Sequence, residues 1–176
     1  MVREVVYTLP YNWSKMVWTI TLGYFVVAVA IVGLLVWAMT QGAVVAGVVG
    51  LVIALPLLIA IAIYCEGYAP QRLEVSASQL TILRRFDSVT ILCSTILSIE
   101  PLNPKDMSWL VTMGGCGGLY GYFGTYSSGR LGQFKMYATS MDNLFLIRTA
   151  DGGKTVIGCT DAALLKKMVG SIAVFE

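Results

Sequence analysis

A stretch of fifty residues, from Met16 to Cys65, contains no Asp, Glu, Lys, Arg or His. Roughly 20 helical residues cross the ~30 Å hydrocarbon core of a bilayer, so this stretch is too long for one span. Its only polar break is TQGA, residues 40–43. Because backbone groups inside lipid must be paired within the segment, we expect two transmembrane helices, 16–39 and 44–65, joined by a tight turn.

The basic residues around this stretch indicate its orientation. Arg3 and Lys15 precede it, the turn between the helices has none, and ten basic residues follow it. Basic flanks stay in the cytoplasm, so we expect the N-terminal segment 1–15 and the C-terminal part to be cytoplasmic. Residues 66–176 carry ten basic and nine acidic side chains, which gives no basic patch and no case for nucleic acid.

Several chemistries are disfavoured by residue content. The chain has no histidine, which removes the usual Ser or Cys triads and most zinc sites. Its four cysteines include no CxxC pair, so we expect no metal and no cofactor. A membrane-embedded enzyme would have to use Cys116, set among glycines, with Arg130 as the sole basic residue of the same loop. We therefore do not expect an enzyme.

Small residues in the second apolar helix recur at every fourth position, at Gly42, Ala46 and Gly50. Small side chains at this spacing let helix backbones approach closely in lipid. They favour packing against the first helix, with a contact between protomers as the alternative. No charge lies within either span, whereas an ion or proton pathway usually needs one. The hairpin is therefore predicted to be an anchor, and a channel or transport-complex accessory subunit is the alternative.

The alternation of apolar and polar residues that marks strands begins after Tyr68. A helix with Leu164, Met168 and Ile172 on one face is expected to end the chain. Seven strand segments precede it, four before residue 103 and three after 132: RLEVS, LTILRR, SVTIL, ILSIEPL, QFKMYAT, NLFLIRT and KTVIGC.

This order of elements, with the segments LTILRRFDSVTILCSTILSIEP (80–101), GLYGYFGTYSSGRLGQFKMYAT (118–139) and NLFLIRTADGGKTVIGCTDAALLKKM (143–168), resembles a bacterial pleckstrin-homology-like (PH-like) domain fused to a transmembrane hairpin. The resemblance implies an α+β protein of the bacterial inner membrane. Residues 68–176 would form a cytoplasmic, seven-stranded antiparallel barrel or sandwich with a C-terminal amphipathic helix. Residues 103–132 would be a glycine- and aromatic-rich insertion.

Within this insertion, GGCGGLYGYFGTYSSGRLG (114–132) holds eight of the chain's eighteen glycines. A P-loop needs GxxxxGK followed by Ser or Thr, and this segment has no lysine. Gly153, Lys154 and Thr155 do spell GKT, but Arg148 stands where the first glycine is required. We therefore expect no nucleotide.

The segment from Met107 to Gly129 carries no charge. Long connections between strands also tend to be functional. Three interpretations stay open: a hairpin that covers its own barrel edge, a contact between protomers, or a segment that dips into the lipid headgroups. The candidate interaction surface is Trp109, Tyr120, Tyr122, Phe123, Tyr126 and Arg130.

The turn SASQ between the first two strands carries no charge, whereas lipid-binding PH domains usually place basic residues there. Arg84 and Arg85 are the nearest basic pair and the candidate contact for a lipid phosphate. The function expected from the sequence is thus a membrane-anchored scaffold or interaction module. Its expected partners are membrane lipid and either a second copy or a membrane protein.

Overall fold

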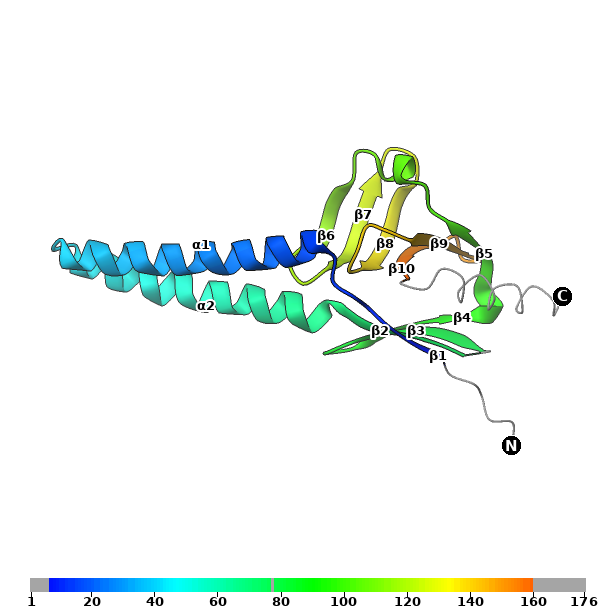
Figure 1. Ribbon diagram of the computed structural model, residues 1–176, viewed down its shortest axis with the longest axis horizontal. Helices are drawn as coiled ribbons and strands as arrows, with labels where there is room; N and C mark the ends of the chain where they lie inside the picture. Colours follow the sequence, from blue (N-terminus) through cyan, green and yellow to red (C-terminus); the bar gives the residue numbers. More distant parts are fainter. Residues whose placement is uncertain (1–6, 77, 160–176) are drawn as a thin grey trace, which may run out of the picture.

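The computed structural model describes residues 7–76 and 78–159 of the 176-residue chain. Two long helices, α1 (Lys15–Thr40) and α2 (Val44–Tyr68), lie side by side and extend from one end of a β-rich domain (Figure 1). Both are long and apolar enough to cross a membrane, and only 6% of the most apolar window of each is buried. A core helix of a soluble protein would be mostly buried, so these helices fit the expected hairpin.

Helix α1 begins where Ser14 caps it, because the Ser14 hydroxyl accepts a hydrogen bond from the Val17 N–H at 3.2 Å. The residues of α2 that face α1 are not all those that were predicted. Gly42 lies in the turn at φ +94°, and Ala46 is exposed. Gly50 does face α1, since a Cβ there would lie 2.7 Å from Leu35 Cδ2.

Gly47, which lies beside the predicted small residues in the sequence, is the buried member of this contact. A Cβ at Gly47 would overlap the Met39 side chain and lie 3.0 Å from the Leu35 carbonyl oxygen. Gly47 and Gly50 are three residues apart and share one face of α2, whereas Ala46 is turned about 100° from Gly47 and Gly42 precedes the helix.

Within the described residues, the β domain contains ten strands in two sheets. The four-stranded sheet has the order β1 (Tyr7–Pro10), β2 (Pro70–Val75), β3 (Gln79–Arg84), β4 (Ser88–Leu92). The six-stranded sheet has the order β5 (Ile96–Pro101), β9 (Leu144–Thr149), β10 (Lys154–Gly158), β8 (Gly132–Ala138), β7 (Tyr122–Ser128), β6 (Val111–Gly117). Two short 3-10 helices, η1 (Cys93–Thr95) and η2 (Pro104–Met107), flank β5.

The seven expected strands are β2 to β5 and β8 to β10. Strands β1, β6 and β7 were not predicted, and the expectation of a wholly antiparallel barrel is wrong at one place. Strand β9 pairs antiparallel with β5 on one side and with β10 on the other. β10 in turn lies between β9 and β8, and it pairs with β8 in parallel. The expected C-terminal helix lies outside the described residues.

Two hydrophobic clusters cover the two faces of the six-stranded sheet. The first lies between the sheets and includes Leu73 and Ile82 from one and Ile147 and Ile157 from the other. The second covers the opposite face around Met136, Phe134 and Val156, and it includes Val17 from α1. The first turn of α1 is therefore part of the domain core.

The helical hairpin is inserted between two neighbouring strands. β1 precedes α1, β2 follows α2 after Ala69 alone, and the two strands pair antiparallel from Tyr7↔Val75 to Pro10↔Arg72 (Figure 1). Both ends of the hairpin thus enter the same sheet.

Candidate functional site

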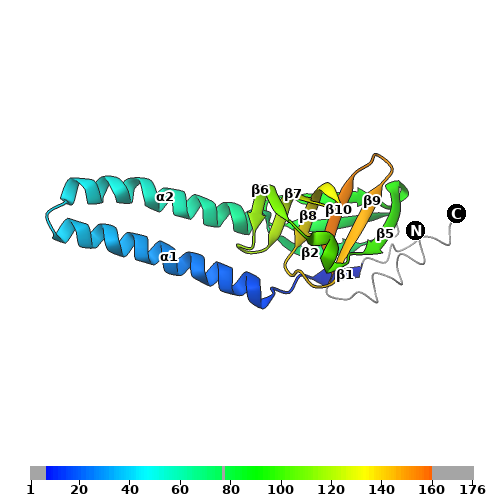
Figure 2. The same cartoon turned by 90° about the horizontal axis from the view of Figure 1, so that it is seen from above.

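The glycine- and aromatic-rich segment folds as the β6–β7 hairpin, residues 111–128, and supplies two strands of the six-stranded sheet. β6 is the outermost strand, and both views place it at the end of the domain next to the helices (Figures 1 and 2). The turn between its strands is closed by a 2.9 Å hydrogen bond from the Gly118 N–H to the Gly121 carbonyl. Of the three interpretations, the segment does form a hairpin at the sheet edge.

The turn of this hairpin contacts α1. The Tyr120 N–H donates to Thr21 Oγ1 at 3.1 Å, and the Tyr120 ring meets Trp13 edge-on at 5.5 Å between centroids. Gly118 adopts φ +118° and lies so close to Ile20 that a Cβ would stand 2.5 Å from Ile20 Cδ1. The positive φ favours glycine here, and a Cβ would also displace the Ile20 side chain.

The same hairpin contacts α2. The Phe123 ring lies 6.3 Å from the Tyr64 ring, and the Cys116 thiol lies 3.2 Å from the Cys65 thiol. Both cysteines are buried and free. The domain is therefore docked against both helices and does not hang from a flexible linker.

The cysteine pair gives a direct test of this docking. Treating the full chain in mild detergent with diamide, an azo oxidant that accepts two electrons and two protons, should link Cys65 to Cys116. Peptide mapping under non-reducing conditions would identify the bridge, and Cys65→Ser should abolish it. Burial predicts slow reaction, since the thiolate is the reactive form. Linkage of Cys116 to Cys159 instead would contradict the docked arrangement.

The structure distributes the predicted interaction surface between core and solvent. Tyr122, Phe123 and Tyr126 are buried, because both faces of β7 are covered by the two hydrophobic clusters. Tyr120 is half-buried against α1. Arg130 is exposed and pairs with Asp106 at 3.1 Å.

Tyr126 carries a pH dependence that can be measured. Its hydroxyl donates to the Cys116 carbonyl, and burial raises its pKa to about 12. The unfolded chain has the ordinary value of about 10, so the folded state holds the proton more tightly. Stability from this group is full below pH ~10 and is lost as the pH rises to about 12. Thermal unfolding midpoints should fall less over this range for Tyr126→Phe than for wild type.

An exposed apolar strip begins just before β6 and continues along its N-terminal half. Trp109 is 88% exposed, Met113 63% and Val111 55%, and we call these three residues the β6 strip. The sequence predicted Trp109 and missed the other two. The signal was the uncharged run itself, which includes them.

The two arginines proposed to contact lipid phosphate are both engaged within the chain. Arg84 pairs with Asp87 at 2.5 Å, and its guanidinium lies 5.4 Å and 5.3 Å from the ring centroids of Tyr68 and Tyr137. Arg85 pairs with Glu66 at the end of α2. These contacts tie β3 to the end of α2, and the buried Arg84 Nε has no hydrogen-bond partner among the described residues.

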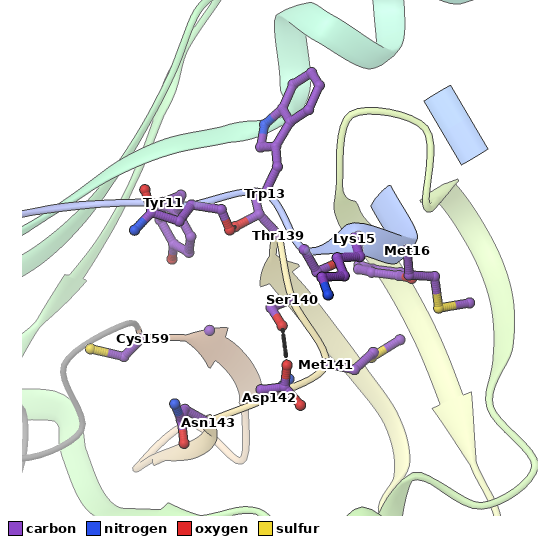
Figure 3. A pocket seen from close by; sticks show the side chains of 14 residues that line it. Tyr11, Trp13, Lys15, Met16, Thr139, Ser140, Met141, Asp142, Asn143 and Cys159 are labelled. Carbon is purple, nitrogen blue, oxygen red and sulfur yellow. Dashed lines mark hydrogen bonds between the residues drawn. The ribbon is translucent and has the colours of Figure 1, made fainter. Parts of the chain in front are cut away.

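A cavity of about 610 Å³ opens where α1 begins (Figure 3). Lys15 and Asp142 lie on different sides of it, and Ser140 donates to Asp142 at 2.9 Å. Tyr122 is among the lining residues, and its buried hydroxyl has no hydrogen-bond partner within the described part of the chain. Burial raises the Tyr122 pKa. Within residues 7–76 and 78–159, no group of three or more His, Cys, Asp or Glu side chains could hold a metal ion.

Comparison with known proteins supports the fold. No curated protein matches the chain, and no solved structure matches it. Residues 71–171, more than half of the chain, match the family model described as Bacterial PH domain. The two sheets, the strand order and this match together show that the chain belongs to the bacterial PH domain family.

Proposed function

We propose that this chain is a membrane-anchored interaction module that holds its PH-like domain at the cytoplasmic face of a bacterial inner membrane and assembles with itself or with a protein partner. The two apolar helices, the docked domain and the single linking residue Ala69 support a fixed orientation of the domain. The basic residues that flank the helices favour the cytoplasmic side. An anchored domain of this kind works through the surfaces that it leaves open.

The observation that carries this proposal is the free edge of β4. Among the described strands, β4 pairs with β3 alone. It forms one side of a groove of about 670 Å³, whose other side is the six-stranded sheet at Thr125, Lys135 and Thr155. An exposed strand edge is a template for pairing with another chain.

The phase of the ladder identifies the backbone groups that face the groove. Hydrogen bonds from Arg84 N–H to the Asp87 carbonyl and from Cys93 N–H to the Ser78 carbonyl close the β3–β4 ladder at its two ends. Hydrogen-bonded and non-bonded pairs alternate in an antiparallel ladder, so Thr90 and Leu92 direct their N–H and C=O groups outward. An extended segment of a partner can add here as a fifth strand.

Thr90→Pro tests this function. Proline removes the outward N–H and is tolerated on edge strands, so the fold should persist while assembly weakens. The matched control, Thr90→Val, keeps the N–H and should retain assembly. The measurement is the mass of the full chain with its co-purifying proteins, after extraction of native membranes in mild detergent. A wild-type chain that is strictly monomeric and free of partners would contradict the proposal.

A further inference from the structure

The charged residues that bound the apolar stretch show how far along each helix the β6–β7 hairpin makes contact. On α1 the turn of the hairpin meets Ile20 and Thr21, five and six residues beyond Lys15, the last charged residue before the apolar stretch. Six helical residues correspond to about 9 Å along the helix axis. The turn therefore lies deeper toward the apolar stretch than the Lys15 backbone does.

The second helix gives the same depth independently. Cys116 of β6 touches Cys65, and the next residue of α2, Glu66, is the first charged residue after the apolar stretch. The hairpin thus meets α1 within its first two turns and α2 at the boundary between apolar and charged sequence. In a membrane-spanning protein this boundary is the headgroup layer.

The strand direction keeps the rest of β6 at that level. The strands β6, β7 and β8 run across the direction of the helices, and they follow one another away from the helices (Figure 1). The view from above agrees that β6 is the strand nearest the helices (Figure 2). The edge of β6 that β7 leaves unpaired is therefore the edge that faces the bilayer.

The exposed side chains at the N-terminal end of this edge strand, which project from the faces of the sheet beside its free edge, have the composition of an interfacial surface. Trp109, Val111 and Met113 are largely exposed, and no charge occurs from residue 107 to 129. Tryptophan and aliphatic side chains with no nearby charge favour the headgroup boundary. Trp13 and Trp18, whose rings lie 5.8 Å apart beside the same hairpin, provide further residues of the kind that gathers at this depth.

A second copy does not fit on this edge. A strand added to β6 would extend the sheet toward the helices, into the space that the bilayer occupies around them. Open strand edges also do not occur within hydrocarbon, because their N–H and C=O groups would stay unpaired. In the headgroup layer, water and lipid oxygens can satisfy these groups.

From these observations, we infer that the β6 strip rests in the headgroup layer of the leaflet that α1 and α2 enter, as a third membrane contact beside the two helices. The partner is a lipid surface, recognised by apolar and aromatic side chains and not by charge. This inference rests on the proposed membrane span of the helices. It adds that the domain itself touches the bilayer through one strand.

Single-tryptophan variants of the full chain test it in vesicles of phosphatidylcholine and phosphatidylglycerol, with and without bromine on the acyl chains near the glycerol. The first variant retains Trp109 and carries Trp13→Phe, Trp18→Phe and Trp37→Phe. The control replaces all four tryptophans by Phe and adds Leu97→Trp. Leu97 is 71% exposed on β5, the opposite edge strand of the same sheet. A third variant retains only Trp37, in the proposed span.

The expected result is that brominated lipid quenches Trp109 at least about twofold more than the tryptophan at position 97, and that Trp109 emits at shorter wavelength. Quenching of Trp37 without quenching of Trp109 would overturn the inference and leave the membrane anchor intact. Loss of quenching at both positions would overturn both. Trp109 shielded from acrylamide but not quenched by brominated lipid would also overturn the inference, since a protein contact would then cover the strip.

A second measurement avoids the multiple substitutions. Met113→Cys and Leu97→Cys, each carrying a nitroxide label, keep all four tryptophans, and the native cysteines are buried. The label at 113 should collide more often with oxygen, which partitions into lipid, and less often with a water-soluble nickel chelate than the label at 97. Equal accessibility at the two positions would contradict the inference.

Discussion

Gly124→Ala is expected to lower the free energy of unfolding by about 3–5 kcal/mol, a large part of the stability of an ordinary domain. Gly124 adopts φ +112°, and a Cβ there would overlap the Gly114 carbonyl oxygen on the neighbouring strand. Gly115 is its partner in the ladder, at φ +130°, with a Cβ that would overlap the Phe123 carbonyl. Two backbones approach here without side chains between them, so neither can shift cheaply.

Gly114→Ala is the matched control. Gly114 lies on β6 next to Gly115, has no positive φ, and has no other atom within 4 Å of the place that an alanine methyl group would take. Alanine there should be neutral or stabilising by about 0.5–1 kcal/mol, because glycine in a strand interior costs that much relative to alanine. Thermal unfolding of the purified chain in mild detergent measures both. Equal midpoints for Gly114→Ala and Gly124→Ala would contradict the close approach of β6 and β7.

Phe123→Ala is expected to cost about 3–5 kcal/mol as well, through the cavity that it leaves. Phe123 is 2% exposed, belongs to the cluster between the sheets and lies against Tyr64 of α2. Its loss removes core packing and part of the contact between domain and helix at the same time. Undocking should therefore accompany destabilisation.

Two readouts separate these effects. Unfolding midpoints report the lost core packing, and the rate of Cys65–Cys116 linkage by diamide reports docking. Leu97→Ala, on an exposed side chain of β5, should change neither. A Phe123→Ala chain that keeps the wild-type midpoint would show that this ring is not part of the core.

Much of the fold follows from sequence patterns that are local. The absence of charge located α1 and α2 to within a few residues, and the alternation of apolar and polar residues located seven strands. β6 and β7 were not predicted because their sequence does not alternate between apolar and polar residues. Glycine has no side chain to contribute, and both faces of β7 are buried, so Tyr122 and Phe123 point into different hydrophobic clusters. β1 was not predicted because its four residues form a strand only by pairing with β2, and the whole helical hairpin separates the two strands in the sequence.

The site was predicted only in part for a related reason. An aromatic residue in an uncharged segment can lie at a surface or in a core, and the sequence does not distinguish them until the pairing of β7 with β8 is known. Trp109 precedes the first strand of the hairpin and stays exposed, whereas Tyr126 lies inside the second and is covered. The Cys65–Cys116 contact joins positions too far apart in sequence for any spacing rule.

The insertion of the helical hairpin between β1 and β2 has a consequence for synthesis in the cell. β1 leaves the ribosome before α1 and must wait, unpaired, until both helices have been made and β2 follows. In the proposed membrane-spanning arrangement, an α2 that failed to return the chain to the starting side of the bilayer would leave β1 and β2 on opposite sides of the membrane. The four-stranded sheet could then close only in a chain whose two helices are both correctly inserted.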